Sequence, residues 1–197
     1  MPTNRPQKGD VIRVDPIRTE KDLRLIKRLL SERPRDYCLF IIGINTNLRA
    51  SDLSKITVGQ IRYLSPGEHF TLREEKTEKL KTVTVNRGVC DAVSKLISAM
   101  PEVDDDFYLF RSQKGRNQPL EVSSIHRLVK TWCREINLKG NFGSHTLRKT
   151  FGFIHRTVHG TDIPTLMEMF NHSSQKQTLA YLGIQPNDVR EAYLKEI

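Results

Sequence analysis

The stretch GSHTLRKTFGFIHRTVHG, residues 143–160, joins an apolar helical stripe to a cluster of basic side chains. Its apolar residues share one face when each residue turns a helix by about 100°: Leu147, Phe151, Ile154 and Val158. This spacing predicts a helix over 145–158 that packs on a core. His145 and Arg148 lie on a different face, one turn apart. With Ser144 as the predicted N-cap, an imidazole, a guanidinium and free backbone N–H groups would face one anion.

A second arginine stands earlier in the chain, in GINTNLRASDLSKI, residues 43–56. Arg49 follows a predicted buried helix, and Asp52 lies three residues further on, where it could preset the guanidinium. Two arginines around one phosphate offer planar, paired donors that lysines do not match. The alternative is an exposed Arg–Asp pair, which contributes little to stability.

Two further segments supply lysine, histidine and tyrosine side chains. REEKTEKLKTVTVN, residues 73–86, is typical of a hairpin, with Lys76 and Lys79 near its tip. Hairpin lysines are mostly solvated charges, but one can also protonate a leaving oxygen. NHSSQKQTLAY, residues 171–181, opens with Asn-His and ends on Tyr181, which is either a core anchor or a nucleophile.

In this order, the four segments resemble the catalytic domain of the tyrosine recombinase (phage integrase) family over about residues 15–195. NLRASDLSKI resembles the first-arginine box, EEKTEKLKTVTV the lysine hairpin, SHTLRKTFG the His-x-x-Arg box and FNHSSQKQTLAYLG the closing His–Tyr segment. Each segment alone is a weak signal, whereas all four in order are specific. The resemblance implies these catalytic residues: Arg49, Lys76, His145, Arg148, His172 and Tyr181.

The resemblance implies a site-specific DNA recombinase or integrase that cleaves and rejoins strands. Tyr181 would attack the scissile phosphorus, forming a 3′-phosphotyrosyl link and releasing a 5′-hydroxyl. The two arginines would stabilise the charge of the transition state, and Lys76 would protonate the leaving oxygen. His145 would assist proton movement at the tyrosine, and His172 would add a hydrogen bond to the phosphate. No metal, nucleotide or other cofactor is implied, because the protein–DNA ester retains the bond energy.

Double-stranded DNA is the implied partner. The resemblance also implies a homotetramer on synapsed DNA, and a monomer or weak oligomer when the protein is free. Two rival functions stay open: a non-catalytic DNA-binding protein of the same fold, and DNA relaxation as in a type IB topoisomerase. A pure binding protein needs no nucleophile, and a topoisomerase usually needs more protein to surround the duplex.

Several positions depart from the family pattern or leave it ambiguous. Asn47 and Asn171 stand where members commonly have glycine, and Asp52 where many have glutamate. Asparagine tolerates a left-handed backbone better than most residues, so we expect both turns to survive. The hairpin holds three lysines close together: Lys76, Lys79 and Lys81. The first best fits the K-T-x-K pattern, and the choice among them stays open.

The whole chain predicts a mainly α fold with a small antiparallel three-stranded β-sheet (α+β). Predicted helices cover 19–30, 34–45, 48–53, 88–99, 122–136, 145–158, 163–170, 174–182 and 187–196. The predicted strands are ITVGQIRYL, HFTLREE and LKTVTVN, all within residues 56–86. Residues 1–18 read as irregular, and 19–197 as the catalytic domain with its C-terminal helix at 187–196. Most relatives carry an N-terminal core-binding domain, so the chain is either an excised domain or a short recombinase such as the fimbrial promoter invertases.

The C-terminal helix carries an apolar stripe: Val189, Ala192, Tyr193 and Ile197. A helix this short must bury such a stripe against something. Packing within the same chain is one alternative, and the family resemblance favours packing on a neighbouring subunit.

Composition agrees with a nucleic-acid partner. The net charge is +9, from 32 Lys+Arg against 23 Asp+Glu, and residues 139–160 hold no acid. Three widely spaced cysteines argue against a disulfide framework or a zinc site. The longest apolar run, YCLFIIGI at 37–44, is too short to span a membrane, and the N-terminus lacks a signal-peptide core. We therefore expect a cytoplasmic, nucleoid-associated protein.

Overall fold

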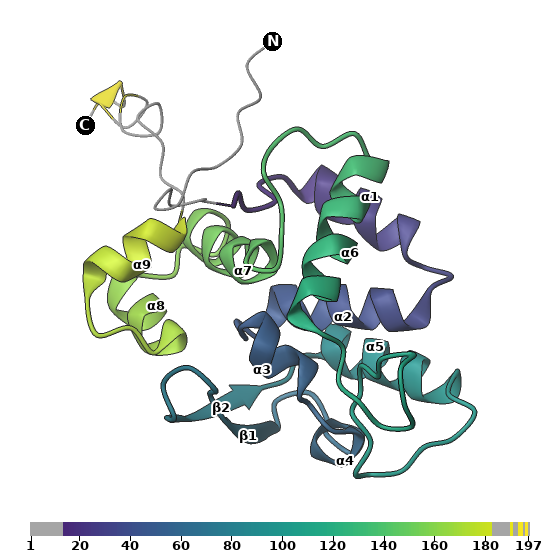
Figure 1. Cartoon of the computed structure of the whole chain (residues 1–197). Helices are drawn as coiled ribbons and strands as arrows, with labels where there is room; N and C mark the ends of the chain where they lie inside the picture. Colours follow the sequence, from purple (N-terminus) through teal and green to yellow (C-terminus); the bar gives the residue numbers. More distant parts are fainter. Residues whose placement is uncertain (1–13, 183–189, 191–192, 195, 197) are drawn as a thin grey trace, which may run out of the picture.

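The computed structural model describes residues 14–182, 190, 193–194 and 196. In this part of the chain helices dominate, and a two-stranded sheet lies at the lower edge of the view in Figure 1. Residues 14–19 have no regular structure, whereas the rest of the irregular segment predicted for 1–18 lies outside the described residues. Most of the helix predicted at 187–196 also lies outside them. No described helix is long and apolar enough to cross a membrane.

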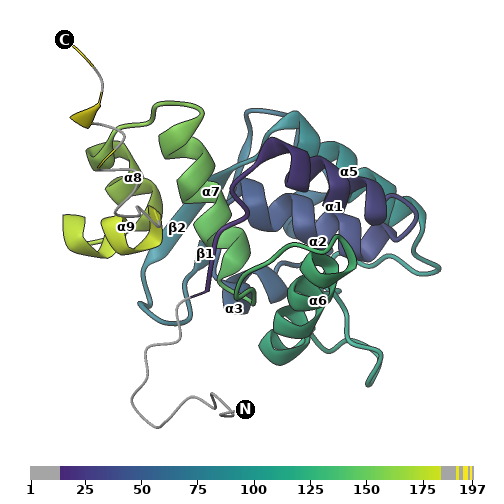
Figure 2. The ribbon, with the colours of Figure 1, turned by 90° about the horizontal axis from the view of Figure 1, so that it is seen from above.

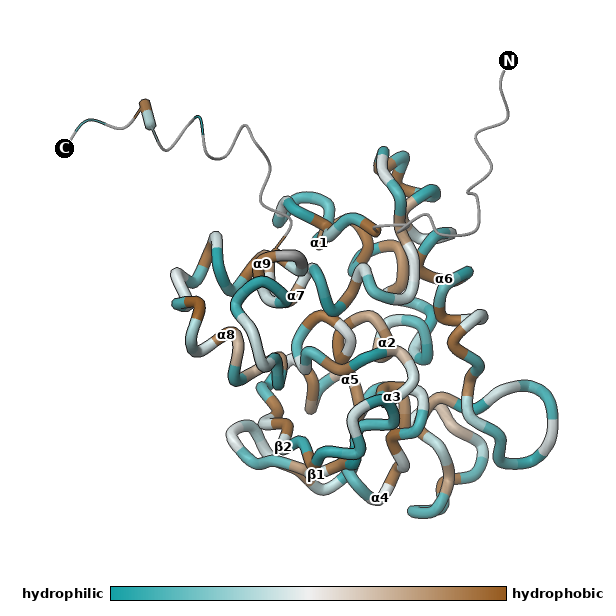
Figure 3. Tube along the Cα trace, turned by 60° about the vertical axis from the view of Figure 1, so that its left-hand side comes forward, coloured by the Kyte–Doolittle hydropathy of each residue, from teal (hydrophilic) through white to brown (hydrophobic). Residues whose placement is uncertain are grey.

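Helix α2 (Pro34–Asn45) forms the centre of the main core. It is buried along most of its length and packs against α5 (Arg87–Ser98) and α7 (Thr146–Thr157). Two further helices, α1 (Glu20–Leu29) and α6 (Val122–Glu135), pack on each other. The rings of Phe40 and Trp132 meet edge to face in this core, with centroids 6.1 Å apart. Figure 3 shows the apolar residues concentrated on these inner helices and the polar ones on the outer loops.

The predicted helix starts depend on local capping. Thr19 accepts a hydrogen bond from the backbone N–H of Asp22 at 3.1 Å and begins α1. Asn86 does the same for α5 through the N–H of Val89, at 3.0 Å. The predicted helix at 48–53 is present as the short helix α3 (Ala50–Ser54). These helices are therefore confirmed to within a few residues.

The prediction of a three-stranded sheet is wrong within the described residues. Strands β1 (His69–Arg73) and β2 (Leu80–Thr84) pair antiparallel, with Phe70 opposite Val83. The segment predicted as the first strand instead contains the helix α4 (Val58–Ile61). Thr57 and Gln60 close a capping box, and this local device overrides the β-branched alternation of the segment.

Helices α7, α8 (Ile163–Phe170) and α9 (Gln175–Leu182) form a second unit with its own apolar cluster. Figure 2 shows these helices side by side on one flank of the molecule. The buried side chains of the cluster are Phe151, Leu166, Phe170 and Leu182. Gly152 permits this approach, because a Cβ atom there would lie 2.7 Å from the Phe170 ring.

We expect Gly43→Ala to destabilise the fold. A Cβ at position 43 would lie 2.4 Å from Cδ1 and 3.1 Å from Cβ of Leu147, at the crossing of α2 and α7. Overpacking of this kind costs about 1–3 kcal/mol. Against this cost stands a gain of about 1 kcal/mol, because alanine has a higher helix propensity than glycine. Urea denaturation should therefore show a net loss of up to about 2 kcal/mol.

Gly88→Ala is the matched control. Gly88 lies in α5, and the nearest contact of a Cβ there would be Oδ1 of Asn86 at 3.5 Å. It should be neutral or stabilising. Equal effects of the two substitutions would contradict a close crossing of α2 and α7.

Candidate active site

An open pocket of about 570 Å³ lies where α3, the β1–β2 hairpin, the start of α7 and α9 meet. These four elements surround one region on the left of Figure 1. Five of the six predicted catalytic residues line the pocket: Arg49, Lys76, His145, His172 and Tyr181. Segments distant in the sequence are thus brought to one place. The sixth predicted residue, Arg148, lies behind the pocket wall.

Arg148 is buried and donates hydrogen bonds to two main-chain carbonyls. The residue is 1% exposed, and its Nη1 donates to the carbonyl of Asn47 and its Nη2 to that of Phe170 at 3.0 Å. The guanidinium carbon lies 4.9 Å from the centre of the Phe170 ring and 5.5 Å from that of Tyr181. Burial, with the nearby charge of Arg49, lowers the pKa of Arg148 to about 10. The group is therefore still a cation at neutral pH, fixed directly behind the tyrosine ring.

Arg49 is paired with two buried carboxylates. Its Nη1 lies 2.6 Å from Oε1 of Glu74 and 3.8 Å from Oδ2 of Asp52. The closer contact lacks hydrogen-bond geometry, so it is a charge pair. Asp52 is within ion-pair reach, as the sequence predicts, but Glu74 is the nearer partner.

Glu74 belongs to the hairpin and has no exposed surface. Burial raises the pKa of its carboxyl group, but a 2.7 Å hydrogen bond from Thr77 and the charges of Arg49 and Lys81 outweigh that effect. The pKa of Glu74 is therefore below its usual value, and the group is an anion at neutral pH. Its charge fixes the first arginine against the hairpin.

The three hairpin lysines lie in two different environments. Lys76 and Lys79 line the pocket. Lys81 is only 8% exposed, because alternate residues of β2 point inward. Its Nζ lies 3.1 Å from the carbonyl oxygens of both Asn47 and Met169. The choice of the lysine that faces a substrate is thus narrowed to Lys76 and Lys79.

His172 and Tyr181 lie against each other, with ring centroids 5.3 Å apart. The His172 ring stacks on Phe170, and its Nδ1 lies 3.0 Å from the hydroxyl oxygen of Thr178. Burial, together with the charges of Arg148 and other cations nearby, lowers the pKa of His172 to about 4. The imidazole is therefore uncharged at neutral pH.

His145 stands at the mouth of the pocket, with its ring centroid 6.5 Å from that of Tyr181. Partial loss of water and the charges of Arg148 and Arg49 lower the pKa of His145. The predicted N-cap of α7 is wrong by one residue, since His145 itself occupies that position. A tight turn shifts the start of the helix: the N–H of Gly143 donates to Oγ1 of Thr146 at 3.0 Å.

The arrangement agrees with comparisons to known proteins. A family model described as the phage integrase family matches residues 11–187. The chain belongs to this family. It is 33% identical over 181 residues to the "Probable integrase/recombinase YoeC" of Bacillus subtilis, an alignment that covers 91% of this chain and 95% of the relative. The curated relatives include tyrosine recombinases XerC, XerD and XerA.

Solved structures of tyrosine recombinases share the fold. The crystal structure of XerA recombinase superposes with a TM-score of 0.73 at 20% identity, covering 96% of this chain and 65% of that one. A second structure is that of the XerH site-specific recombinase, bound to its palindromic difH substrate in a post-cleavage complex. It superposes with a TM-score of 0.71 at 20% identity, over 88% of this chain. The chain spans only 49% of the XerH chain. Relatives and structural neighbours are thus site-specific recombinases and integrases, which supports DNA cleavage and rejoining as the activity.

Two positions at which the phage integrase family commonly has glycine adopt the backbone that glycine favours. Asn47 and Asn171 both have φ of 55°, and Asn171 ends α8 in the left-handed conformation. Asn47 also provides a bond that glycine cannot, because its Nδ2 donates to the carbonyl of Met169 at 2.6 Å. The expectation that both turns survive is confirmed.

Sequence reasoning missed the role of Glu74 and the burial of Lys81. Glu74 and Lys81 lie in the predicted strands HFTLREE and LKTVTVN, where the sequence assigns no role to Glu74 and leaves Lys81 among the candidate hairpin lysines. The alternation of β2 carried a usable signal, because Lys81 shares its strand face with Val83. No comparable signal marked Glu74, which depends on the approach of Arg49 from another element.

We expect Asn47→Ala to destabilise the protein more than Asn47→Gly. Both remove the bond to Met169, but only alanine strains a left-handed residue, by about 1–2 kcal/mol. Urea denaturation of both variants measures the difference. Asn171→Ala and Asn171→Gly should follow the same order, and equal losses for alanine and glycine would contradict the left-handed turn.

Proposed function

We propose that the chain is a tyrosine-type site-specific recombinase that cleaves and rejoins double-stranded DNA. The oxygen of Tyr181 attacks the scissile phosphorus, the bond from phosphorus to the 5′-oxygen breaks, and a 3′-phosphotyrosyl ester remains. The observation that carries this proposal is the single pocket that gathers Tyr181, Arg49, His145 and His172 in front of Arg148. Because the ester keeps the bond energy, the reaction requires neither a nucleotide nor a metal.

The two arginines would stabilise the charge of the pentacoordinate phosphorus. Each such donor lowers the barrier by about 3–4 kcal/mol. Nε of Arg148 is buried without a hydrogen-bond partner among the described residues. An unpaired buried donor is costly, by about 1–3 kcal/mol, so a phosphate oxygen that accepts from it would relieve this cost. Arg49 lines the pocket and would bind another non-bridging oxygen.

Proton transfer would involve the lysine and the histidines. We assign Lys76 as the acid that protonates the leaving 5′-oxygen, with Lys79 as the alternative, since both line the pocket. His145 has a lowered pKa and would be uncharged at neutral pH, so it can take the proton of Tyr181. His172, whose pKa is about 4, would donate a neutral hydrogen bond to the phosphate.

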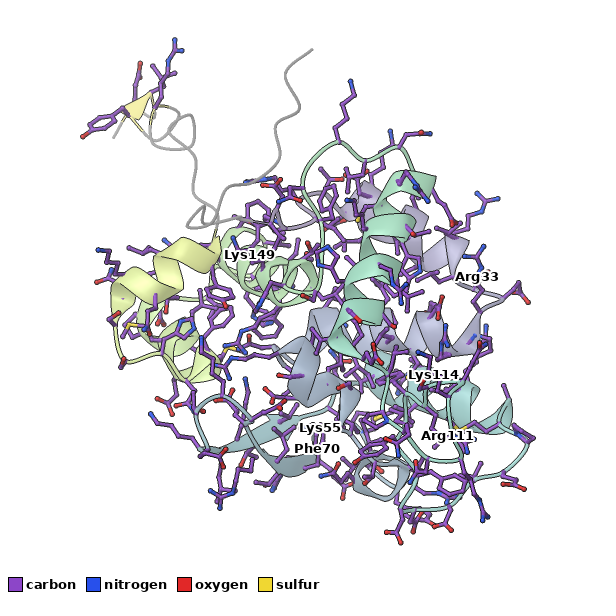
Figure 4. The ribbon with its side chains drawn as sticks, viewed as in Figure 1. Arg33, Lys55, Phe70, Arg111, Lys114 and Lys149 are labelled. Carbon is purple, nitrogen blue, oxygen red and sulfur yellow. The ribbon has the colours of Figure 1, made fainter. Side chains whose placement is uncertain are left out.

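Shallow pockets beside the site would guide the duplex. The site pocket shares Ser51 and Val122 with a neighbour of about 360 Å³, which shares Lys114 with a third of about 350 Å³. Four basic side chains border this track: Arg35, Lys55, Lys114 and Arg127. Two carboxylates also line it, Glu121 and Glu75, and the latter pairs with Lys55 at 3.2 Å. Figure 4 shows Lys55 and Lys114 on the same part of the molecule as Arg111. Neutralising phosphates along such a track releases counterions and favours binding.

Complete recombination also requires a DNA site and an assembly of several subunits. XerH has been solved with its difH substrate, and we infer a comparable DNA partner for residues 19–197 acting as the catalytic domain. Such a protein would work at the nucleoid in the cytoplasm. Strand exchange between two sites would need a homotetramer, assembled from free monomers or weak oligomers.

Tyr181→Phe should abolish covalent capture of a nicked suicide duplex that carries inverted repeats from the DNA flanking the gene. Only the hydroxyl is removed, so binding of the intact duplex, followed by gel shift over a range of salt concentrations, should stay within about threefold. A protease-sensitive protein–DNA adduct that persists in this variant would overturn the assignment.

Removal of residues 187–197 should leave a protein that folds and binds DNA but does not complete strand exchange. The segment follows α9, which carries Tyr181, and its apolar stripe would pack on a neighbouring subunit. Thermal melting, gel shift and recombination of two marked sites measure the three properties. Loss of folding would instead favour packing within the chain, and normal recombination would contradict both arrangements.

A further inference from the structure

We propose that Lys81 is a positioning residue for strand cleavage. Its ammonium group ties the turn before Arg49 to the turn before His172 and places positive charge behind Arg148. This inference rests on the proposed function and adds a residue that does not itself touch the substrate.

Lys81 connects the two turns through hydrogen bonds to two main-chain carbonyls that are far apart in the sequence. Nζ of Lys81 donates to Asn47 and to Met169, both at 3.1 Å. Asn47 is two residues before Arg49, and Met169 is three residues before His172. One side chain from β2 thus connects both turns that deliver pocket residues.

The ammonium is not needed to satisfy these carbonyls. The carbonyl of Asn47 also accepts from Nη1 of Arg148, and that of Met169 accepts from Nδ2 of Asn47 at 2.6 Å. An uncharged side chain of similar length at position 81 would leave each carbonyl with a donor. Since burying a charge is costly, the charge itself is the property that needs an explanation.

Four charged groups act on Lys81: Arg49 and Asp52 from the α3 segment, Glu74 from the hairpin and Arg148 from α7. His172, which precedes α9, is also close enough for the charge of Lys81 to lower its pKa, but its imidazole is uncharged at neutral pH. His155 of α7 lines a pocket of about 340 Å³ together with Lys81. Burial and the charge of Arg148 lower the pKa of Lys81 to about 7, although Glu74 and Asp52 oppose them. A phosphate bound in front of the arginines adds negative charge and favours the ammonium form.

The test compares Lys81→Met and Lys81→Arg with the wild-type chain on the suicide duplex. We expect K81M to cleave at least tenfold more slowly while duplex binding changes less than threefold. K81R should recover most of the rate, because it restores a cation. Lys21→Met makes the same change on the exposed surface of α1 and should behave as wild type. If K81M does not fold, Lys81→Gln replaces it in every measurement.

The dependence on pH separates this role from a merely structural one. The ratio of wild-type to K81M cleavage rates should be largest at low pH and should shrink as pH rises, because the wild-type ammonium loses its proton. In the DNA complex this loss should occur above pH 7, since the bound phosphate raises the pKa of Lys81 from its value of about 7 in the free protein. The difference in folding stability between wild type and K81M changes with pH in the opposite direction, in favour of the wild type as pH rises. The unfolded chain keeps this proton up to its ordinary pKa of 10.5, so wild type gains stability relative to K81M between about pH 7 and 10.5.

Failure of the inference and failure of the proposed function give different results. Equal cleavage by wild type and K81M at every pH would overturn the inference alone. If the wild-type chain forms no Tyr181-dependent adduct, the proposed function fails and this inference with it.

Discussion

The main-chain carbonyl of Asn47 is the contact on which the site depends. It accepts hydrogen bonds from Arg148 of α7 and from Lys81 of β2, while the Asn47 side chain bonds to Met169 at the end of α8. Four segments that are far apart in the sequence therefore converge on one peptide unit. That unit must adopt a left-handed backbone, with φ of 55°, to present its carbonyl in this direction. A turn of one residue thus fixes the relative positions of the arginines, the hairpin and the tyrosine segment.

Because these segments converge on one peptide unit, several positively charged side chains are brought close together. Arg49, Arg148 and Lys81 lie close together, and the buried carboxylates of Glu74 and Asp52 only partly offset them. Burial is the main cause of the lowered pKa values of both pocket histidines, and the excess positive potential lowers them further. A site in this state is prepared for an anion before one arrives, since a phosphate reduces the repulsion among groups that the fold already holds in place.

Much of this arrangement follows from local sequence, and the rest depends on contacts that local sequence does not encode. Helical spacing and caps predict α1, α2 and α5 well, and the order of the four motif segments predicts which side chains meet at the pocket. The alternation in ITVGQIRYL misleads, because a capping box at Thr57 and Gln60 decides the structure there. The burial of Arg148 and the pairing of Arg49 with Glu74 depend on long-range packing, so the spacing of residues alone cannot reveal them.

The division of the apolar interior into two clusters has a consequence for the lifetime of the reactive arrangement. Tyr181 is carried by α9, which is held in the smaller cluster by the buried Leu182 and by the partly buried ring of Tyr181 itself, whereas the main core is built from other helices. Fully burying one such side chain stabilises by only about 1.5–3 kcal/mol. We expect a segment that depends on so small a cluster to open locally at a lower free energy than the main core. The population able to form a covalent bond is therefore a fraction of the folded population, and that fraction multiplies the chemical rate.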